Sequence, residues 1–180
     1  MRRFIGHKPR PTAGFTLIEL IVVVLIIGIL SALAAPGWLG FMNRQRVGAV
    51  RTEIAQTLRT AQQQAQQRRQ NVTVLATTID GQPALSVNGL TQPLSGNGVV
   101  QVAAFSVNSD GTKNIAATTI AFDFRGIPTD PTVVPFVFDV TLNGGSRQCV
   151  RIGTLLGSIK TFSGNSDNNG DGVLDCDEPL

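Results

Sequence analysis

One uninterrupted apolar segment constrains this chain more than any other feature. Residues 15–35 read FTLIELIVVVLIIGILSALAA, 21 positions whose only formal charge is Glu19. As a helix with about 1.5 Å rise per residue, the segment would be roughly 31 Å long, which matches the hydrocarbon thickness of a bilayer. In a chain of 180 residues, this leaves room for one globular domain. The sequence therefore predicts a single membrane span attached to one exported domain.

The basic charge of the chain is concentrated before this segment. Residues 1–14 carry four Lys or Arg and no acid, whereas the remaining residues carry 11 basic and 12 acidic side chains. The formal net charge of +3 is therefore mostly a property of the leader. By the positive-inside rule this distribution predicts a cytoplasmic N-terminus, and it argues only weakly for nucleic-acid binding.

Three ordinary explanations of the N-terminus each leave a feature unexplained. A secretory signal peptide has an apolar core of roughly 7–15 residues, which is shorter than this one. A simple membrane anchor fits the length but not Glu19, because an acid in lipid costs at least about 2.5 kcal/mol unless it is paired. The pair Arg2-Arg3 suggests a twin-arginine signal, but the apolar segment is again too long.

Residues 8–19 read KPRPTAGFTLIE, and this stretch resembles the class III signal of type IV pilins and type II secretion pseudopilins. The resemblance covers residues 8 to about 70 and rests on the basic leader, the Gly-Phe junction, the acid at the fifth following position and the apolar helix. It implies that a prepilin peptidase cleaves after Gly14 and methylates the new amino group of Phe15. Glu19 would then pair with the ammonium group of Phe15 on a neighbouring subunit, which would compensate its burial.

The apolar segment is followed by an amphipathic one. Because proline removes an intrahelical hydrogen bond, we expect a bend or local melting at Pro36. Between Arg44 and Gln70, apolar residues recur every three or four positions, which predicts one helical face packed on a domain. That face consists of Val47, Val50, Ile54, Leu58, Ala61 and Ala65. Asn71 is the expected end of the helix.

Beyond residue 71 the hydrophobic period becomes two, which is typical of strands. The predicted strands are 72–79, 84–88, 99–107, 115–124, 134–142 and 147–156. Asn143-Gly144-Gly145 is the clearest hairpin signal between them. The expected fold class is α+β, a type IV pilin fold with a long N-terminal helix on an antiparallel sheet. We expect a leader at 1–14, a transmembrane or filament-core helix at 15–36, an amphipathic helix at 37–71 and a β-rich domain at 72–180.

Two cysteines and an acidic segment mark the last third of the chain. An even number of cysteines in an exported chain favours a disulfide between Cys149 and Cys176 over two free thiols. Residues 167–178 read DNNGDGVLDCDE and satisfy the twelve-residue calcium-loop pattern. The calcium ligands would be Asp167, Asn169, Asp171, Val173, Asp175 and Glu178. The alternative is a solvated acidic turn, because no second helix can follow in this sequence.

The residue pattern does not predict an enzyme. His7, in the leader, is the only histidine, and no Ser or Thr lies in a nucleophile-elbow pattern. Residues 120–130 and 147–161 resemble the C-terminal domain of the H-type pseudopilins and FimT-like minor pilins. This resemblance implies a structural subunit with three kinds of partner: a prepilin peptidase, other pilins in a helical filament and the bacterial inner membrane. It would span that membrane once and then enter a periplasmic or extracellular filament, with no required cofactor.

The alternative is a minor pilin at the filament tip that binds DNA or a surface. Phosphate contacts could come from Arg125, Arg147, Arg151 and Lys160. Four dispersed cations are also typical of a solvated face. Members involved in DNA uptake tend to carry a basic Gly-Arg-x-Arg motif, and the matching stretch here, residues 157–160, reads GSIK. This departure from the family pattern lowers the case for DNA binding.

Overall fold

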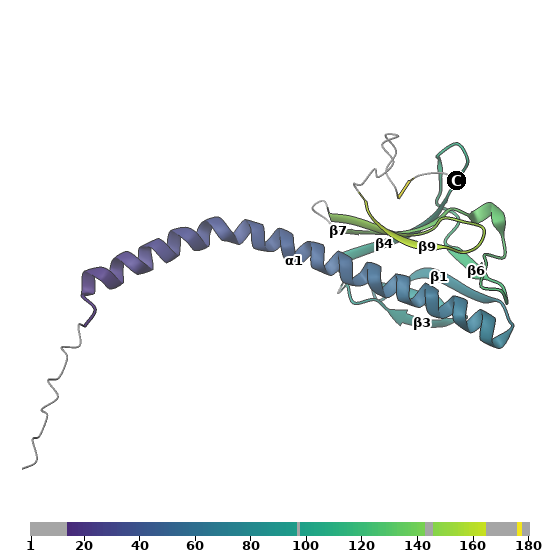
Figure 1. The fold of residues 1–180 in the computed structure, drawn as a ribbon, viewed down its shortest axis with the longest axis horizontal. Coiled ribbons are helices and arrows are strands. Elements are labelled where there is room, and N and C mark those ends of the chain that lie inside the picture. The colour runs from purple at the N-terminus through teal and green to yellow at the C-terminus, as the bar shows by residue number, and fades with distance from the viewer. Residues whose placement is uncertain (1–13, 97, 143–145, 165–175, 178–180) are drawn as a thin grey trace, which may run out of the picture. The chain divides into compact units, whose positions relative to one another are not determined.

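The computed structural model describes residues 14–96, 98–142, 146–164 and 176–177, without the side chains of residues 34–36. Its longest element is the helix α1, Leu17–Arg68 (Figure 1). The two halves of this helix belong to different compact units of the chain. The chain divides into two compact units, Met1–Gly40 and Phe41–Leu180. The boundary separates the apolar half of α1 from the half that carries the domain.

In the first unit, the apolar half of α1 exposes its side chains. The large apolar residues between Leu17 and Leu33 are 45–78 % exposed. No single helix in the described part of the chain meets the length and hydropathy requirements for a membrane span. Leu17–Leu33 and Gly37–Arg68 meet them only together, as a pair broken between them. Pro36 lies in that break, where side chains are not described, so the predicted bend at this residue stays a prediction.

In the second unit, α1 packs through the face that the sequence predicts. Its six apolar residues are at most 1 % exposed. The helix ends at Arg68, three residues before the expected stop at Asn71. Arg69 adopts a left-handed conformation with φ 52°, and the Gln70 N–H donates to the Ala65 carbonyl at 3.3 Å. This hydrogen bond back across the last turn is a Schellman-type ending, which can occur without glycine.

The described strands form two antiparallel sheets, where the sequence predicts one. The strand orders are β3-β2-β1-β6 and β5-β4-β7-β8-β9. The first sheet contains β1 Val72–Ile79, β2 Gln82–Val87, β3 Leu90–Pro93 and β6 Thr119–Phe122. The second contains β4 Val100–Val107, β5 Lys113–Asn114, β7 Phe136–Leu142, β8 Ser146–Ile152 and β9 Ile159–Ser163. A short 3₁₀ helix, η1, covers Pro131–Val133.

The differences from the predicted strands occur mainly at sheet edges. β3 and β9 are edge strands that the sequence analysis misses, and the predicted strand 115–124 shortens to β6. Every residue of β3 is exposed, so it has no buried face to impose a period of two. The two-residue turns Asp80-Gly81 and Asn88-Gly89 have positive φ throughout, which confirms them as tight hairpin turns. Residues 143–145 lie outside the described residues, while β7 and β8 pair Leu142 with Ser146 as a hairpin requires.

The second sheet has a different hydrophobic cluster on each face. On one face, Phe136, Phe138 and Val140 join a core shared by α1 and both sheets. On the other face, Val137 belongs to a smaller cluster that includes both cysteines. Because successive side chains of a strand point to opposite faces, this smaller cluster lies on the sheet face turned away from α1. We call that side the outer face.

Candidate functional site

The predicted cleavage junction lies at the exposed start of α1. Phe15 is 83 % exposed, and a Cβ built on Gly14 would meet no atom within 4 Å. Thr16 caps the helix, because its Oγ1 accepts the Glu19 N–H at 3.3 Å. Glu19 is exposed in the first turn, and no hydrogen bond or ion pair of its carboxylate occurs within the described residues. The structure thus brings Gly14, Phe15 and Glu19 together at one accessible helix end.

The predicted disulfide is present in the C-terminal part of the chain. Cys149 and Cys176 are joined with an S–S distance of 2.02 Å, and both are fully buried. Cys149 comes from the centre of β8, so the bond attaches the described residues 176–177 to the outer face of the second sheet. The cysteine prediction is confirmed.

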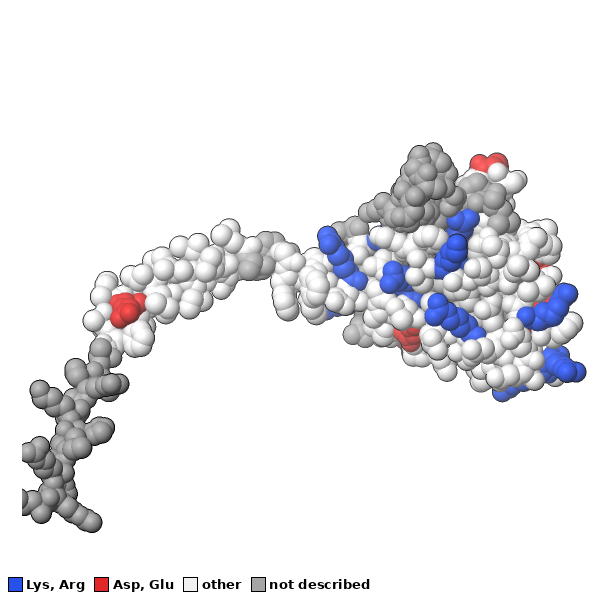
Figure 2. All heavy atoms as spheres, viewed as in Figure 1, with Lys and Arg blue, Asp and Glu red and all other residues white. Residues whose placement is uncertain are grey.

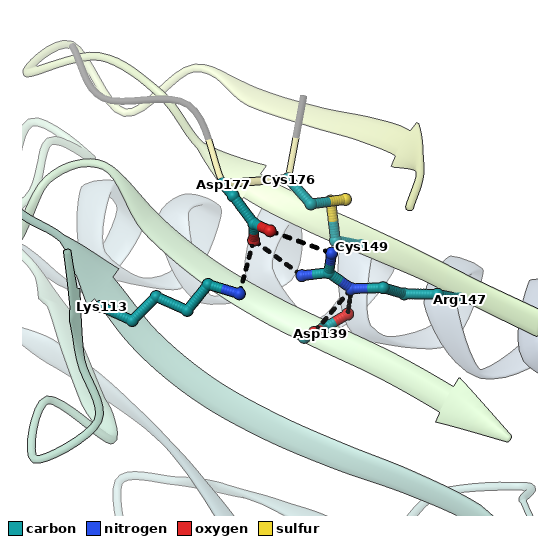
Figure 3. Close-up of a disulfide and its surroundings, with 6 residues drawn as sticks. All are labelled: Lys113, Asp139, Arg147, Cys149, Cys176 and Asp177. Carbon is teal, nitrogen blue, oxygen red and sulfur yellow. Dashed lines mark hydrogen bonds and ion pairs between the residues drawn. A yellow bond between two sulfur atoms is a disulfide. The ribbon is translucent and has the colours of Figure 1, made fainter. Parts of the chain in front are cut away.

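Beside the disulfide, Arg147 binds two carboxylates (Figure 3). Its Nε donates to both oxygens of Asp139 at 2.9 and 3.0 Å. Its Nη1 and Nη2 donate to Asp177 at 3.1 and 2.7 Å. The Lys113 ammonium lies 2.9 Å from Asp177. We call these four residues the ionic cluster.

The two carboxylates of the ionic cluster respond differently to Arg147. Burial raises the pKa of Asp139 above its ordinary value, and the opposing charge and hydrogen bonds of Arg147 do not fully offset it. Burial also acts to raise the pKa of Asp177, but hydrogen bonds and charges from both Arg147 and Lys113 bring it below its ordinary value. Asp139 is the more deeply buried of the two, and the negative charge of Asp177 also raises its pKa, whereas Asp177 accepts hydrogen bonds from both cations.

The sequence analysis did not identify the ionic cluster. The signal lay in the strand register: Asp139 pairs with Cys149, so Arg147, two residues earlier in β8, is its diagonal neighbour. Asp177 follows Cys176 directly, and the disulfide therefore positions the Asp177 carboxylate beside Arg147. A register taken from the predicted 143–145 hairpin would have placed the first pair.

Of the four cations considered for phosphate binding, two form ion pairs within the domain and a third is buried. Arg125 forms an ion pair with Asp123 at 2.9 Å, and Arg147 belongs to the ionic cluster. Arg151 is 7 % exposed. Lys160, paired with Arg151 in the strand register, is exposed. The DNA-binding alternative therefore stays a hypothesis that these contacts do not favour.

The proposed calcium ligands cannot be placed. Asp167, Asn169, Asp171, Val173, Asp175 and Glu178 all lie outside the described residues. Within the part of the chain that is described, no group of three or more His, Cys, Asp and Glu side chains could hold a metal ion. The calcium loop therefore stays a prediction.

An open groove also follows the second half of α1. Its volume is about 1080 Å³, and Arg44, Gly48, Arg51 and Glu53 line it from the helix, with Ser95 opposite. The Ser95 N–H and hydroxyl both donate to the Glu53 carboxylate at 3.0 Å. The sequence analysis missed this groove, since only the fold brings Ser95 to the helix.

Two family models match successive parts of the chain. The prokaryotic N-terminal methylation motif matches residues 9–35, and the type II transport protein GspH matches residues 51–156. The first match contains Gly14, Phe15 and Glu19. The second begins within α1 and ends after β8, so it covers more than half of the chain and most of the described domain.

Curated relatives agree with these matches. A fimbrial protein of Pseudomonas aeruginosa is 37 % identical over 105 residues, which are 58 % of this chain and 66 % of the relative. The chain thus spans slightly less than two thirds of that relative. The type IV major fimbrial protein FimA of Dichelobacter nodosus is 52 % identical over 48 residues, 27 % of this chain and 30 % of that protein.

A solved structure has the same fold. The type IV minor pilin FimU of Pseudomonas aeruginosa superposes with a TM-score of 0.51 at 17 % identity, covering 67 % of this chain and 90 % of that chain. At this identity the likeness concerns the fold alone. It matches the expected type IV pilin fold, in which a long N-terminal helix packs on an antiparallel β-sheet domain.

Proposed function

The chain belongs to the GspH family of type II transport proteins, and from that premise we propose that it is a minor pilin or pseudopilin, a structural subunit of a type IV pilus or type II secretion pseudopilus. One observation carries the proposal. The Gly14–Phe15 junction and Glu19 lie directly before a helix whose apolar side chains are exposed along its first half. Such a surface has to be covered by lipid or by other subunits.

The proposal includes a processing step at the helix start. A prepilin peptidase would cleave the Gly14–Phe15 bond and methylate the new amino group of Phe15. The exposure of Phe15 and the open space around Gly14 support access to this bond. Before cleavage the apolar half of α1 would anchor the chain once in the bacterial inner membrane, with the basic leader in the cytoplasm.

Glu19 would then drive assembly. An ionised carboxylate in an apolar environment is unfavourable without a cationic partner. The amino group of Phe15 on a neighbouring subunit supplies such a partner after cleavage. The Glu19 side chain is exposed at the helix start, which leaves it accessible to another subunit.

Replacement of Glu19 tests the proposal. In cells that assemble filaments, Glu19→Val is expected to remove the chain from the sheared filament fraction while it accumulates in the membrane fraction. Formation of the Cys149–Cys176 disulfide in the variant reports that the domain has folded. Asp80→Asn, an exposed carboxylate in a hairpin turn, is the matched control. If Glu19→Val enters filaments as well as the control does, the assembly role of Glu19 is wrong.

We also propose that residues 167–178 bind calcium as a structural ion. The twelve-residue ligand pattern supports this, and Cys176 at its tenth position supplies no ligand, so that the disulfide and the ion do not compete. Calcium in excess over EDTA is expected to raise the melting temperature of the protein, and Asp171→Asn to reduce that rise. An unchanged melting temperature would exclude a structural calcium ion.

A further inference from the structure

The charges of the domain are separated by element. Residues 41–69, in and just after the second half of α1, carry six arginines and one glutamate. Residues 70–164 carry five basic and five acidic side chains and are neutral overall. Residues 165–180 carry five acids and no base. Figure 2 shows Lys and Arg spread over the face where α1 lies, with few carboxylates among them.

Ion pairs are formed within the part of the domain that follows α1. Asp123 pairs with Arg125, and Asp139 with Arg147, each at 2.9 Å. Among the described residues, no ion pair joins an arginine of α1 to a carboxylate. The helix therefore has an uncompensated positive charge of the kind that attracts an acidic partner.

The groove on α1 concentrates this charge. Arg44 and Arg51 line it, separated by seven positions and therefore on one side of the helix. The Arg51 Nε is buried and has no hydrogen-bond partner within the described residues. Glu53 is the one carboxylate among the lining residues, and Ser95 already donates two hydrogen bonds to it. Arg44 and Arg51 can thus donate hydrogen bonds to the carboxylates of an incoming acidic chain segment.

The residues that flank the acidic segment of the same copy are attached to β8, away from the groove. The Gly164 N–H donates to the Arg147 carbonyl at 2.9 Å, and the disulfide fixes Cys176 to Cys149. Gly164 and Cys176, which flank the segment, are thus both joined to β8, and Cys149 belongs to the cluster on the outer face. The α1 helix packs on the other face of this sheet. A contact between the segment and the groove is thus favoured between two copies.

We propose that the groove on α1 binds the acidic segment 165–175 of a second copy of this chain. The contact would join Arg44 and Arg51 of one copy to Asp167, Asp171 and Asp175 of the other in the calcium-free form of the segment, because the same carboxylates are ligands of the proposed calcium ion. The inference deepens the proposed function, because neighbouring subunits of a filament could form the contact. It is tested in detergent, where no filament is required, so its failure and the failure of filament assembly are distinguishable.

Zero-length cross-linking can detect this contact. The Arg51→Lys substitution keeps the positive charge and introduces an amine that a carbodiimide can couple to a carboxylate. Full-length protein carrying it is prepared unlabelled and ¹⁵N-labelled, mixed in detergent with EDTA to free the carboxylates of metal, and cross-linked. Mass spectrometry distinguishes links within one copy from links between copies. The link between Lys113 and Asp177, which are 2.9 Å apart, reports coupling and folding in every sample.

We expect mixed-isotope links from the amine introduced at position 51 to residues 165–175. Arg69→Lys, an exposed position beyond the end of α1 and outside the groove, is the matched control and should give at least about tenfold fewer such links. Asp171→Asn with Asp175→Asn should reduce them by a similar factor. Salt at about 1 M should also reduce the number of these links, because it shortens the electrostatic screening length to about 3 Å. Equal linking of both lysine variants, links within single copies only, or no link while Lys113–Asp177 couples would each overturn the proposal.

Discussion

At the scale of single residues, Arg147 organises the outer face of the second sheet. It forms ion pairs with one carboxylate from the neighbouring strand and with one from the C-terminal part of the chain. All three side chains are at most 21 % exposed, so their hydrogen bonds are less screened than those of a surface ion pair. The lowered pKa of Asp177 means that its ionised form is stabilised by folding, and this gives the cluster a defined pH dependence.

Asp177→Asn should destabilise the protein in a pH-dependent way. Because the folded pKa lies below the unfolded one, the contribution of Asp177 is complete above about pH 4 and is lost as the pH falls through its folded pKa. We expect Asp177→Asn to lower the free energy of unfolding by about 1 kcal/mol near neutral pH. The difference from wild type should shrink towards zero in strong acid. Urea unfolding of the oxidised protein over a pH series measures both.

Asp80→Asn controls for the loss of one negative charge at the surface. Its effect should be small at every pH. If Asp177→Asn is as neutral as this control near neutral pH, the ionic cluster does not stabilise the fold.

At the scale of elements, the sequence predicts what is buried and regular. The apolar face of α1, the central strands β1, β4 and β7, and the turn at Asp80-Gly81 all follow from local patterns that the fold preserves. Edge strands such as β9 escape detection, because partly solvated residues need not alternate. The division into two sheets is also not predicted, because the hydrophobic period indicates that a strand is buried but not which strand it pairs with.

Loops held by the helix are a second feature that local patterns cannot predict. The Gln62 amide on α1 donates to the Gly126 carbonyl at 3.0 Å and to the Gly157 carbonyl at 2.8 Å. It joins two loops 64 and 95 residues away in sequence. In the sequence, Gln62 is one of a run of glutamines that reads as the solvated face of a helix. Only the tertiary fold distinguishes the role of Gln62 from that of the adjacent glutamines.

Gln62→Ala should therefore destabilise the domain more than the same change at the next position. Both carbonyls would lose a donor in a partly buried site, for which we expect a loss of about 1–2 kcal/mol in the free energy of unfolding. Gln63→Ala is the control, because Gln63 is exposed on the same helix and the substitution favours the helix equally. Chemical denaturation of the two variants gives the comparison, and equal values would mean that Gln62 does not secure the loops.

At the scale of the whole molecule, the two units differ in what they bury. Every buried apolar residue among those described, from Val47 onwards, belongs to the unit Phe41–Leu180. The described apolar residues of the other unit are exposed. The sequence predicts this division well, because an apolar run without polar alternation and an amphipathic helix are distinct patterns. The sequence pattern does not predict the ionic cluster on the outer face, because that cluster depends on strand register.

Removal of residues 1–40 should accordingly change solubility without changing the stability of the fold. The truncated chain loses exposed apolar surface but none of the buried core. We expect it to stay in solution without detergent, with the Cys149–Cys176 bond formed. Its melting temperature should match that of the full-length chain in detergent within about 4 °C, since a shift of that size corresponds to about 1 kcal/mol in a domain of this length. A much larger decrease would show that the first half of α1 supports the domain, and the division of the chain into an anchoring helix and a separately stable domain would be wrong.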